Sequence, residues 1–286
     1  MLNKNKEQES REAKSNLLSF YLKNHSVGKV HSKFNKGLNI QFEDALLYVG
    51  CIGTPLSAFG LNLEQEKLKH ILNSVKIDDM VVNKGQQLIF YSFDEIIKIY
   101  DEDIEEVDLK IPKIKCKIDE IADTALYQYL ENIEIEKSIG IDLDERTSRH
   151  LELLLKSDKT DSNLNLLIIK FFAGRGKGLT PSGDDILLGF TLGLSLFCSF
   201  DAWRQTLVST VTKEATTMVS VAYLTALLQG YASEPCIRLV KLLDDGETEQ
   251  IEKTVEQVMS FGHTSGSDTL FGFLLGLKFL IHHWEG

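Results

Sequence analysis

The spacing of apolar residues changes along the chain near residue 118. From residue 27 to residue 117, apolar positions form short runs separated by turn residues, which is typical of β-strands. Asn35-Lys36-Gly37 and Asn83-Lys84-Gly85 each separate two such runs and predict hairpins, because Asn and Gly tolerate positive φ. Further strands are predicted at 44–50, 95–100 and 110–117, and one helix at 64–75.

The second half of the chain has apolar residues at the three-to-four spacing of helices. We therefore predict an α+β fold in which a β-rich domain of barrel or sandwich type, 16–118, precedes an α-helical domain, 119–286. Residues 1–15 are expected to form a flexible tail, and the acidic run 101–108 a solvated loop or a charged sheet edge. Helices are predicted at 16–23, 119–135, 147–155, 162–172, 184–200, 201–230, 235–243, 247–261 and 266–284.

Composition narrows the classes of function. The 286 residues are 43% hydrophobic and carry 31 basic against 42 acidic side chains, a net charge of −11, which argues against a nucleic-acid binder. No apolar stretch reaches the roughly 20 residues that span a bilayer, and the charged start of the chain lacks a signal peptide. Four widely spaced cysteines without a C-x-x-C pair indicate reduced thiols and a cytoplasmic protein.

One phrase occurs twice in the helical half. SGDDILLGFTLGL at 182–194 recurs 83 positions later as SGSDTLFGFLLGL at 265–277, with nine of thirteen residues identical. Each copy places a polar Ser-Gly-x-Asp turn at the start of an apolar helix.

The repeat also sets glycines on one face of each helix. Glycine at every fourth position lets two helix backbones approach closely. We therefore predict that the two helices cross on their glycines about an approximate twofold axis, so that both helix starts open into one cleft. The alternative is that the glycines accommodate bulky neighbours elsewhere. The positions are Asp185, Gly189 and Gly193 in the first copy and Asp268, Gly272 and Gly276 in the second.

The helix starts have a structural and a functional interpretation. Structurally, each serine is a natural N-cap and the Asp three residues later completes a capping box. Functionally, Gly183 and Gly266 would leave backbone N–H groups accessible, and with the helix dipole these groups would bind an anion. Thr216, Thr217 and Ser220 on a later predicted helix would line the same cleft or simply pack there.

The loops before the two helices add charged and hydroxyl groups. A phosphate or carboxylate would bind the cations and helix starts, while the Asp carboxylates orient an N–H donor or act as base. We expect no cofactor and no metal ligands; a divalent cation held by the Asp carboxylates is the weaker alternative. The predicted catalytic residues are Asp184, Asp185 and Asp268, and the predicted anion-binding residues are Arg175, Lys177, Gly178, Thr180, Ser182, Gly183, His263, Thr264, Ser265 and Gly266.

Other nucleotide and hydrolase motifs do not fit. In GRGKGLTP, Lys177 is followed by glycine and leucine rather than by the Ser or Thr of a P-loop. The same glycines follow a predicted helix, whereas a Rossmann fingerprint follows a strand. No G-x-S-x-G elbow occurs in the sequence, which argues against a serine-hydrolase triad.

The two phrases resemble the hallmarks of a bacterial family long catalogued as a domain of unknown function. GRGKGLTPSGDDILLGFTLGL is similar to its G-x-G-x-G-L-T-P-S-G-D-D motif and glycine-spaced helix, with Lys177 where many members have proline. GHTSGSDTLFG is similar to its second motif, G-H-[ST]-S-G-x-D-x-L-x-G, and GKVHSKFNKGLNI to its opening strands.

The resemblance implies a function. Members are linked to a heteromeric oxamate carbamoyltransferase of anaerobic allantoin breakdown, a route of purine nitrogen catabolism. The chain would then be a transferase subunit that works with other subunits on oxamate, carbamoyl phosphate or phosphate, with no nucleic acid or membrane as partner. The alternative hypothesis is a non-catalytic subunit that binds an anionic metabolite or acts as a scaffold, with the chemistry on a sister subunit.

Overall fold

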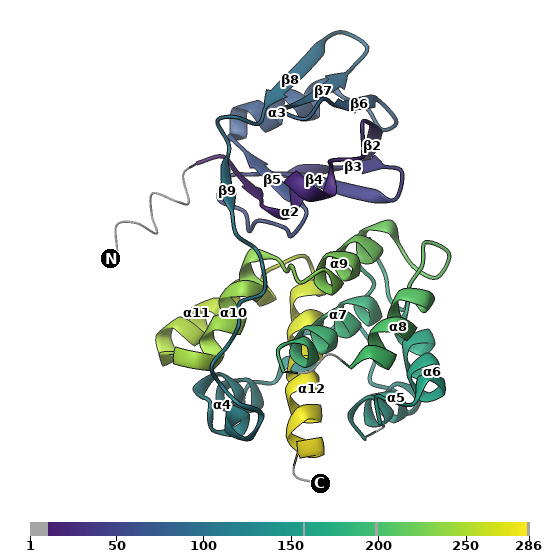
Figure 1. The fold of residues 1–286 in the computed structure, drawn as a ribbon, viewed down its shortest axis with the longest axis vertical. Helices are drawn as coiled ribbons and strands as arrows, with labels where there is room; N and C mark the ends of the chain where they lie inside the picture. The colour runs from purple at the N-terminus through teal and green to yellow at the C-terminus, as the bar shows by residue number, and fades with distance from the viewer. Residues whose placement is uncertain (1–10, 157, 198–199, 285–286) are drawn as a thin grey trace. The chain divides into compact units, whose positions relative to one another are not determined.

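The computed structural model describes residues 11–156, 158–197 and 200–284. It confirms the predicted α+β fold, with a β-rich region first and helices after it (Figure 1). The chain divides into two compact units. One contains Met1–Lys110 and Tyr231–Glu234, and the other contains Ile111–Gly230 and Pro235–Gly286. We call the first the sheet unit and the second the helical unit.

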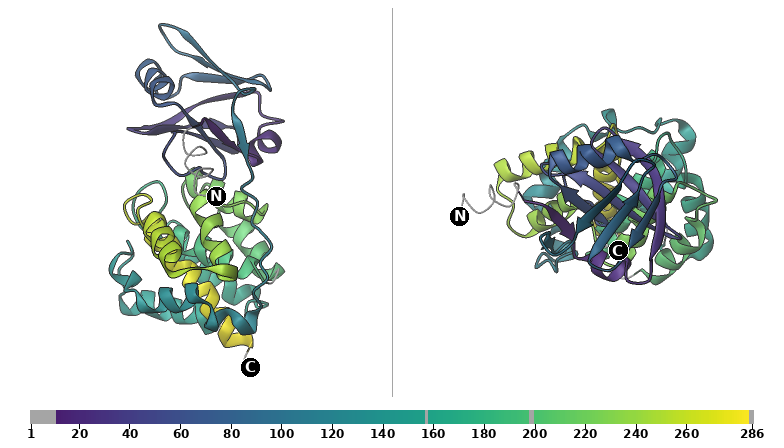
Figure 2. Two further views of the ribbon diagram at one scale, coloured as in Figure 1. Left: turned by 90° about the vertical axis from the view of Figure 1, so that its left-hand side faces the viewer. Right: turned by 90° about the horizontal axis from the view of Figure 1, so that it is seen from above.

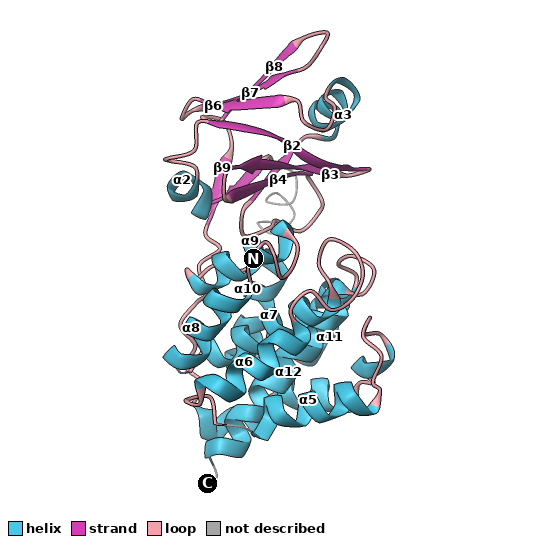
Figure 3. Ribbon diagram, turned by 90° about the vertical axis from the view of Figure 1, so that its right-hand side faces the viewer, coloured by secondary structure: helices cyan, strands magenta, loops and turns pink. Residues whose placement is uncertain are grey.

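The strands of the sheet unit form a single curled sheet (Figure 3). Within the described residues it has nine strands: β1 (Ala13–Ser15), β2 (Val27–Phe34), β3 (Gly37–Phe42), β4 (Ala45–Cys51), β5 (Gly60–Leu63), β6 (Met80–Asn83), β7 (Gln87–Tyr91), β8 (Ile96–Tyr100) and β9 (Glu105–Val107). Their order is β8-β7-β6-β2-β3-β4-β5-β1-β9. Neighbours are antiparallel except for the parallel pairs β4–β5 and β1–β9, and the sheet forms a half-barrel.

Most sequence predictions for this unit are confirmed. The two Asn-Lys-Gly segments join β2 to β3 and β6 to β7 as antiparallel hairpins. The predicted strands at 44–50 and 95–100 are β4 and β8, and the predicted helix at 64–75 is α3 (Gln65–Ser74). The predicted helix at 16–23 is the shorter α2 (Leu17–Tyr21). The acidic run contains β9, the last strand of the sheet, so it is a charged edge.

The strand predicted at 110–117 is wrong. Only Lys110 makes a β-bridge, to Tyr231, and residues 111–117 belong to no strand. Pro112 follows at once, and proline cannot donate a hydrogen bond to a sheet ladder. Residues 1–10 of the predicted tail lie outside the described residues, and Ala13–Ser15 forms β1, which pairs with β5 and β9.

The helical unit contains longer elements. Two predicted helices are each divided. The segment 119–135 is interrupted where Thr124 caps a new helix by accepting from Tyr127 N at 3.2 Å. The segment 201–230 is interrupted where Thr217 accepts from Ser220 N at 3.1 Å. The elements are η1 (Ile118–Asp123), α4 (Ala125–Asn132), η2 (Ile135–Lys137), α5 (Glu145–Lys156), α6 (Ser162–Phe172), α7 (Ser182–Ser195), α8 (Asp201–Thr210), α9 (Met218–Leu228), α10 (Glu234–Asp245), α11 (Thr248–Met259) and α12 (Ser265–Trp284).

Helices α7 and α12 cross on their glycines, as the repeat predicts. A Cβ on Gly189 would collide with the carbonyl oxygen of Thr269, and a Cβ on Gly272 would collide with that of Ile186. Ile186 and Thr269 occupy the same position of the two phrases, as do Gly189 and Gly272. The contacts are therefore reciprocal, which confirms the pseudo-twofold relation. In Figure 2, α12 passes in yellow through the helical unit.

The structure also bears on the predictions about membrane spans and cysteines. Among the residues that the structure describes, none of the helices has both the length and the apolar character needed to cross a bilayer. Cys51 and Cys116 are free thiols, and Cys198 lies outside the described residues.

Candidate functional site

The first turns of α7 and α12 bury polar side chains. Ser182 and Asp185 are 3% exposed, Asp184 is 2% exposed and Asp268 is 0% exposed. An unpaired carboxylate is costly to bury, so such groups require hydrogen bonds or a proton. The contacts of these side chains therefore decide what the two helix starts can do.

The two helices exchange hydrogen bonds at this point. Asp185 of α7 interacts with the hydroxyl of Ser265 at the start of α12. Asp268 of α12 interacts in turn with the hydroxyl of Ser182 at the start of α7. Because the repeat makes the two Asp residues equivalent, and likewise the two Ser residues, these bonds follow the same pseudo-twofold relation as the glycine contacts. The two helix starts are adjacent.

The predicted capping box is wrong for α7. That helix begins at Ser182, and its N-cap residue is Pro181, which lacks the N–H that an Asp side chain would need. The carbonyl of Pro181 instead accepts from the N–H groups of Asp184 at 2.9 Å and Asp185 at 3.2 Å. In α12, Ser265 is also the first helical residue, and Asp268 N donates to Thr264 O at 2.8 Å.

The two glycines of the Ser-Gly-x-Asp turns do not leave their N–H groups accessible, contrary to the prediction. Gly183 N donates to Arg175 O at 2.8 Å, and Gly266 N donates to Phe261 O at 2.9 Å. A Cβ on Gly183 would collide with the carbonyl of Phe172 at the end of α6, and a Cβ on Gly266 with a carbonyl near the end of α11. These glycines allow the preceding helix to pack against the helix start.

Burial shifts the pKa of both repeated carboxyl groups. Burial raises the pKa of Asp185 well above its usual value, and the nearby charges of Asp268 and Asp184 raise it further against the hydrogen bonds of Ser265 and Thr180. Burial also raises the pKa of Asp268, although Gly140 N donates to its Oδ1 at 2.8 Å.

One oxygen of each carboxyl group lacks a partner. Asp185 Oδ2 and Asp268 Oδ2 are buried and accept no hydrogen bond from the residues that the structure describes. Such an oxygen is stabilised by carrying a proton or by a donor supplied from outside the protein. The paired helix starts therefore present two adjacent groups that can hold a proton or accept an N–H.

Asp184 has a different set of contacts. Its Oδ1 accepts from Gly174 N at 2.8 Å, and its Oδ2 accepts from the Thr216 hydroxyl. Burial raises its pKa, while these bonds and one from Ser220 lower it. Asp184 thus joins the loop before α7 to the segment that leads into α9. Its equivalent in the second phrase is Ser267, so this connection belongs to one copy only.

The basic side chains of the loop before α7 are not fully buried: Arg175 is partly buried and Lys177 is exposed. The guanidinium carbon of Arg175 lies 4.2 Å from the ring centroid of Phe171, and that of Arg146 lies 5.4 Å from the same ring. His150 stacks on this ring at 3.7 Å. Both arginines also lower the pKa of Asp144, after its stronger bonds to Thr147. Arg175 therefore belongs to a cationic cluster around Phe171.

The comparison with known protein families bears directly on these helix starts. Residues 172–277 match the family model for the oxamate carbamoyltransferase subunit AllH. The resemblance expected from the two phrases is thus confirmed over this segment, which contains both helix starts and the crossing of α7 and α12. No solved structure gives a significant match to the chain.

Within the AllH-matched segment, the structure brings together only part of the predicted set. Thr180 Oγ1 donates to Ser265 Oγ at 3.3 Å, which places the end of the glycine-rich loop on the second helix start. The residues gathered at the helix starts are Thr180, Ser182, Asp185, Thr264, Ser265 and Asp268. Lys177, Gly178 and His263 are exposed.

Gly140 lies outside the AllH-matched segment, and the sequence did not predict it as a site residue. It is exposed, yet its N–H reaches Asp268, and a Cβ on it would lie 2.5 Å from Thr264 Oγ1. No local pattern marks this residue, because its role depends on a contact with a residue 128 positions away.

Proposed function

We propose that this chain is a subunit of a cytoplasmic carbamoyltransferase of purine nitrogen catabolism. Its site lies at the paired starts of α7 and α12, and it works with other subunits on oxamate, carbamoyl phosphate or phosphate. The observation that carries the proposal is the pair Asp185 and Asp268. Each has a buried oxygen without a partner, and both lie in the segment that matches the carbamoyltransferase subunit family.

The chemistry of a carbamoyl group suits these two side chains. Its amide carries two N–H donors, which the unpartnered Asp oxygens can accept. When an N-carbamoylated oxamate is the donor, the carbamoyl carbon exchanges its bond to the oxamate nitrogen for a bond to a phosphate oxygen. The phosphate hydroxyl gives up a proton and the departing oxamate nitrogen takes one up, which leaves oxamate and carbamoyl phosphate. A carboxyl group whose pKa is raised by burial can hold and deliver that proton.

Anion binding would come from the surroundings of the helix starts. Two helix N-termini favour negative charge nearby. Arg175 adds a guanidinium, and Lys177 an exposed ammonium on the same loop. Since Asp185 and Asp268 are buried, substrate would have to displace the Thr180 and Gly140 contacts that lie on them.

The test is a binding titration of the full chain, alone and co-purified with its partner subunits. Carbamoyl phosphate and oxamate should release heat with the wild type, and Asp185→Asn and Asp268→Asn should weaken binding roughly tenfold or more, a loss of about 1.4 kcal/mol. Asp201→Asn, at the exposed start of α8, is the matched control and should bind like the wild type.

The alternative, a non-catalytic metabolite-binding or scaffolding subunit, is favoured by one observation. The N–H groups of Gly183 and Gly266 are used within the protein, as expected of a structural helix junction. If neither ligand releases heat, with the chain alone or with the complex, the result supports the scaffolding role. If the complex binds ligand but Asp185→Asn does not change its turnover, the result supports the metabolite-binding role.

A further inference from the structure

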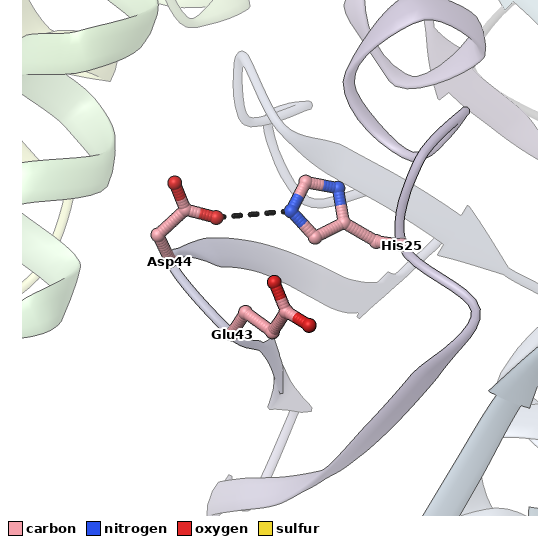
Figure 4. Close-up of side chains that lie close together, drawn as sticks. All are labelled: His25, Glu43 and Asp44. Carbon is pink, nitrogen blue, oxygen red and sulfur yellow. Dashed lines mark hydrogen bonds and ion pairs between the residues drawn. The ribbon is translucent and has the colours of Figure 1, made fainter.

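Three potential metal ligands meet in the sheet unit, in a region that the carbamoyltransferase proposal does not use. One ligand atom each from His25, Glu43 and Asp44 lies within 4.8 Å of the others (Figure 4). His25 lies between α2 and β2, and the two carboxylates form the turn between β3 and β4. The sheet fixes this turn, because Phe42 and Ala45 on either side are paired in the β3–β4 ladder.

The hydrogen bonds of His25 orient its ring toward the carboxylates. Its Nδ1 lies 3.0 Å from the carbonyl oxygen of Tyr21, which can only accept, so Nδ1 carries the proton of this bond. In the neutral ring, Nε2 then presents a lone pair. Nε2 lies 3.0 Å from Asp44 Oδ1, and a carboxylate oxygen is also an acceptor.

A cation that binds both the Nε2 of the neutral ring and Asp44 Oδ1 would stabilise these two facing acceptors. A backbone carbonyl that holds Nδ1–H while Nε2 faces outward is the usual arrangement of histidine ligands of metals. The nearby Glu43 carboxylate favours the cation further, because it brings a second negative charge to the same point.

We propose that His25, Glu43 and Asp44 form a binding site for a divalent transition-metal ion of the zinc class. One imidazole nitrogen with two carboxylate oxygens suits Zn²⁺ or Co²⁺, whereas Mg²⁺ and Ca²⁺ prefer oxygen ligands alone. The Asp44 side chain is 80% exposed, so water completes the coordination and the ion exchanges with solvent.

The experiment is a titration of the tag-free full chain with Zn²⁺ by calorimetry and with Co²⁺ by visible absorption. The wild type should bind one ion per chain at this site, and Mg²⁺ should not compete. Asp44→Asn and Glu43→Gln should each weaken Zn²⁺ affinity by about tenfold or more, in the range seen when groups around a metal are removed. Both residues are exposed, so these variants are expected to fold normally.

His70 provides the matched control. It pairs with Glu95 at 3.1 Å in the same unit, and His70→Gln should leave Zn²⁺ binding unchanged. His25→Gln should abolish binding, with the far-ultraviolet spectrum confirming that the Tyr21 contact is not needed for folding. Absence of stoichiometric binding to the wild type, or binding that is equal in Asp44→Asn and the wild type, would overturn the proposal.

Discussion

The first turns of α7 and α12 differ from the turns that follow in what they bury. The first turns bury the hydroxyl of Ser182 and the carboxyl groups of Asp185 and Asp268. The later turns bury aromatic and aliphatic side chains, such as Phe190 and Phe273, around glycines that bring the backbones together. The same two helices thus contain a polar start and an apolar body.

Packing explains why the body of the helix pair is stable, but it does not explain the polar groups buried at its start. Buried apolar surface and close backbone contact stabilise the body directly. The start contains buried carboxyl oxygens without partners, which lowers stability. Perturbed carboxyl groups of this kind gather at functional sites more often than elsewhere. This difference between the two regions supports the proposed site at the helix starts.

The largest effect is expected from filling the glycine crossing. Gly189→Leu and Gly272→Leu should each destabilise by several kcal/mol, at about 1–3 kcal/mol per forced contact, because the added side chain meets the backbone of the other helix. Gly193→Ala should cost less, since its Cβ would lie 3.1 Å from the nearest atom, Phe273 O. Urea denaturation measures the differences. If either leucine variant unfolds like the wild type, the backbones of the body are not in close contact.

One buried charged side chain, Lys159, lies against the aromatic rings around the body. The Lys159 amine lies 4.6 Å from the ring centroid of Phe279, 5.6 Å from that of Phe190 and 5.7 Å from that of Trp203. Burial lowers its pKa from 10.5 to about 7, against the charge of Asp158. The unfolded chain therefore holds this proton up to about pH 10.5 while the folded chain releases it near pH 7, so stability should rise with pH across that window and be lost as pH falls through 7.

Lys159→Met tests this pH dependence. It should remove the rise in stability between pH 7 and pH 10.5 and stabilise the helical unit at neutral pH by roughly 1–4 kcal/mol, the gain reported when buried charges are replaced by apolar groups. Trp203 fluorescence in urea at several pH values follows the transition, and Lys170→Met, on the exposed side of α6, is the control. An unchanged pH slope would mean that the amine is charged in the folded state.

A smaller effect is expected at the contact that only the first phrase has. Thr216→Val removes the hydroxyl that donates to Asp184 Oδ2 and should cost about 1–3 kcal/mol, because a buried carboxylate loses a donor. Ser220→Ala should act in the same direction, and the double variant should be non-additive because both hydroxyls bond one carboxylate. Thermal denaturation of the three variants measures this coupling. Simple additivity would contradict a shared contact.

The smallest change in stability should come from Asp185→Asn. Because burial raises the pKa of Asp185, the stability of the wild type should decrease as the pH rises from the usual Asp pKa through the raised pKa. The variant should not show this decrease. At pH 8 the variant should be as stable as the wild type or more stable, by about 1 kcal/mol. A marked loss of stability instead would show that the start of the helix pair is structural, like its body.

Much of the fold could be predicted from local pattern. Alternation and Asn-Lys-Gly turns locate the hairpins, and helical spacing locates α6 at 162–172 without error. The short strands β1 and β5 were not predicted, because three or four residues carry too little pattern and form strands only through their partners. The division of 201–230 also escaped prediction, since Thr217 acts as a cap only when the chain turns there.

The sequence alone predicted that two glycine-faced helices cross, because glycine at every fourth position of a repeated phrase lets two helix backbones approach closely. Only the tertiary structure decided which groups meet at the helix starts. Ser182 and Ser265 bond to the Asp of the opposite helix, and the glycine N–H groups serve the protein itself. Periodicity specifies which face of a helix is buried, but a side chain's partner depends on segments far along the chain, as with Gly140 beside Asp268.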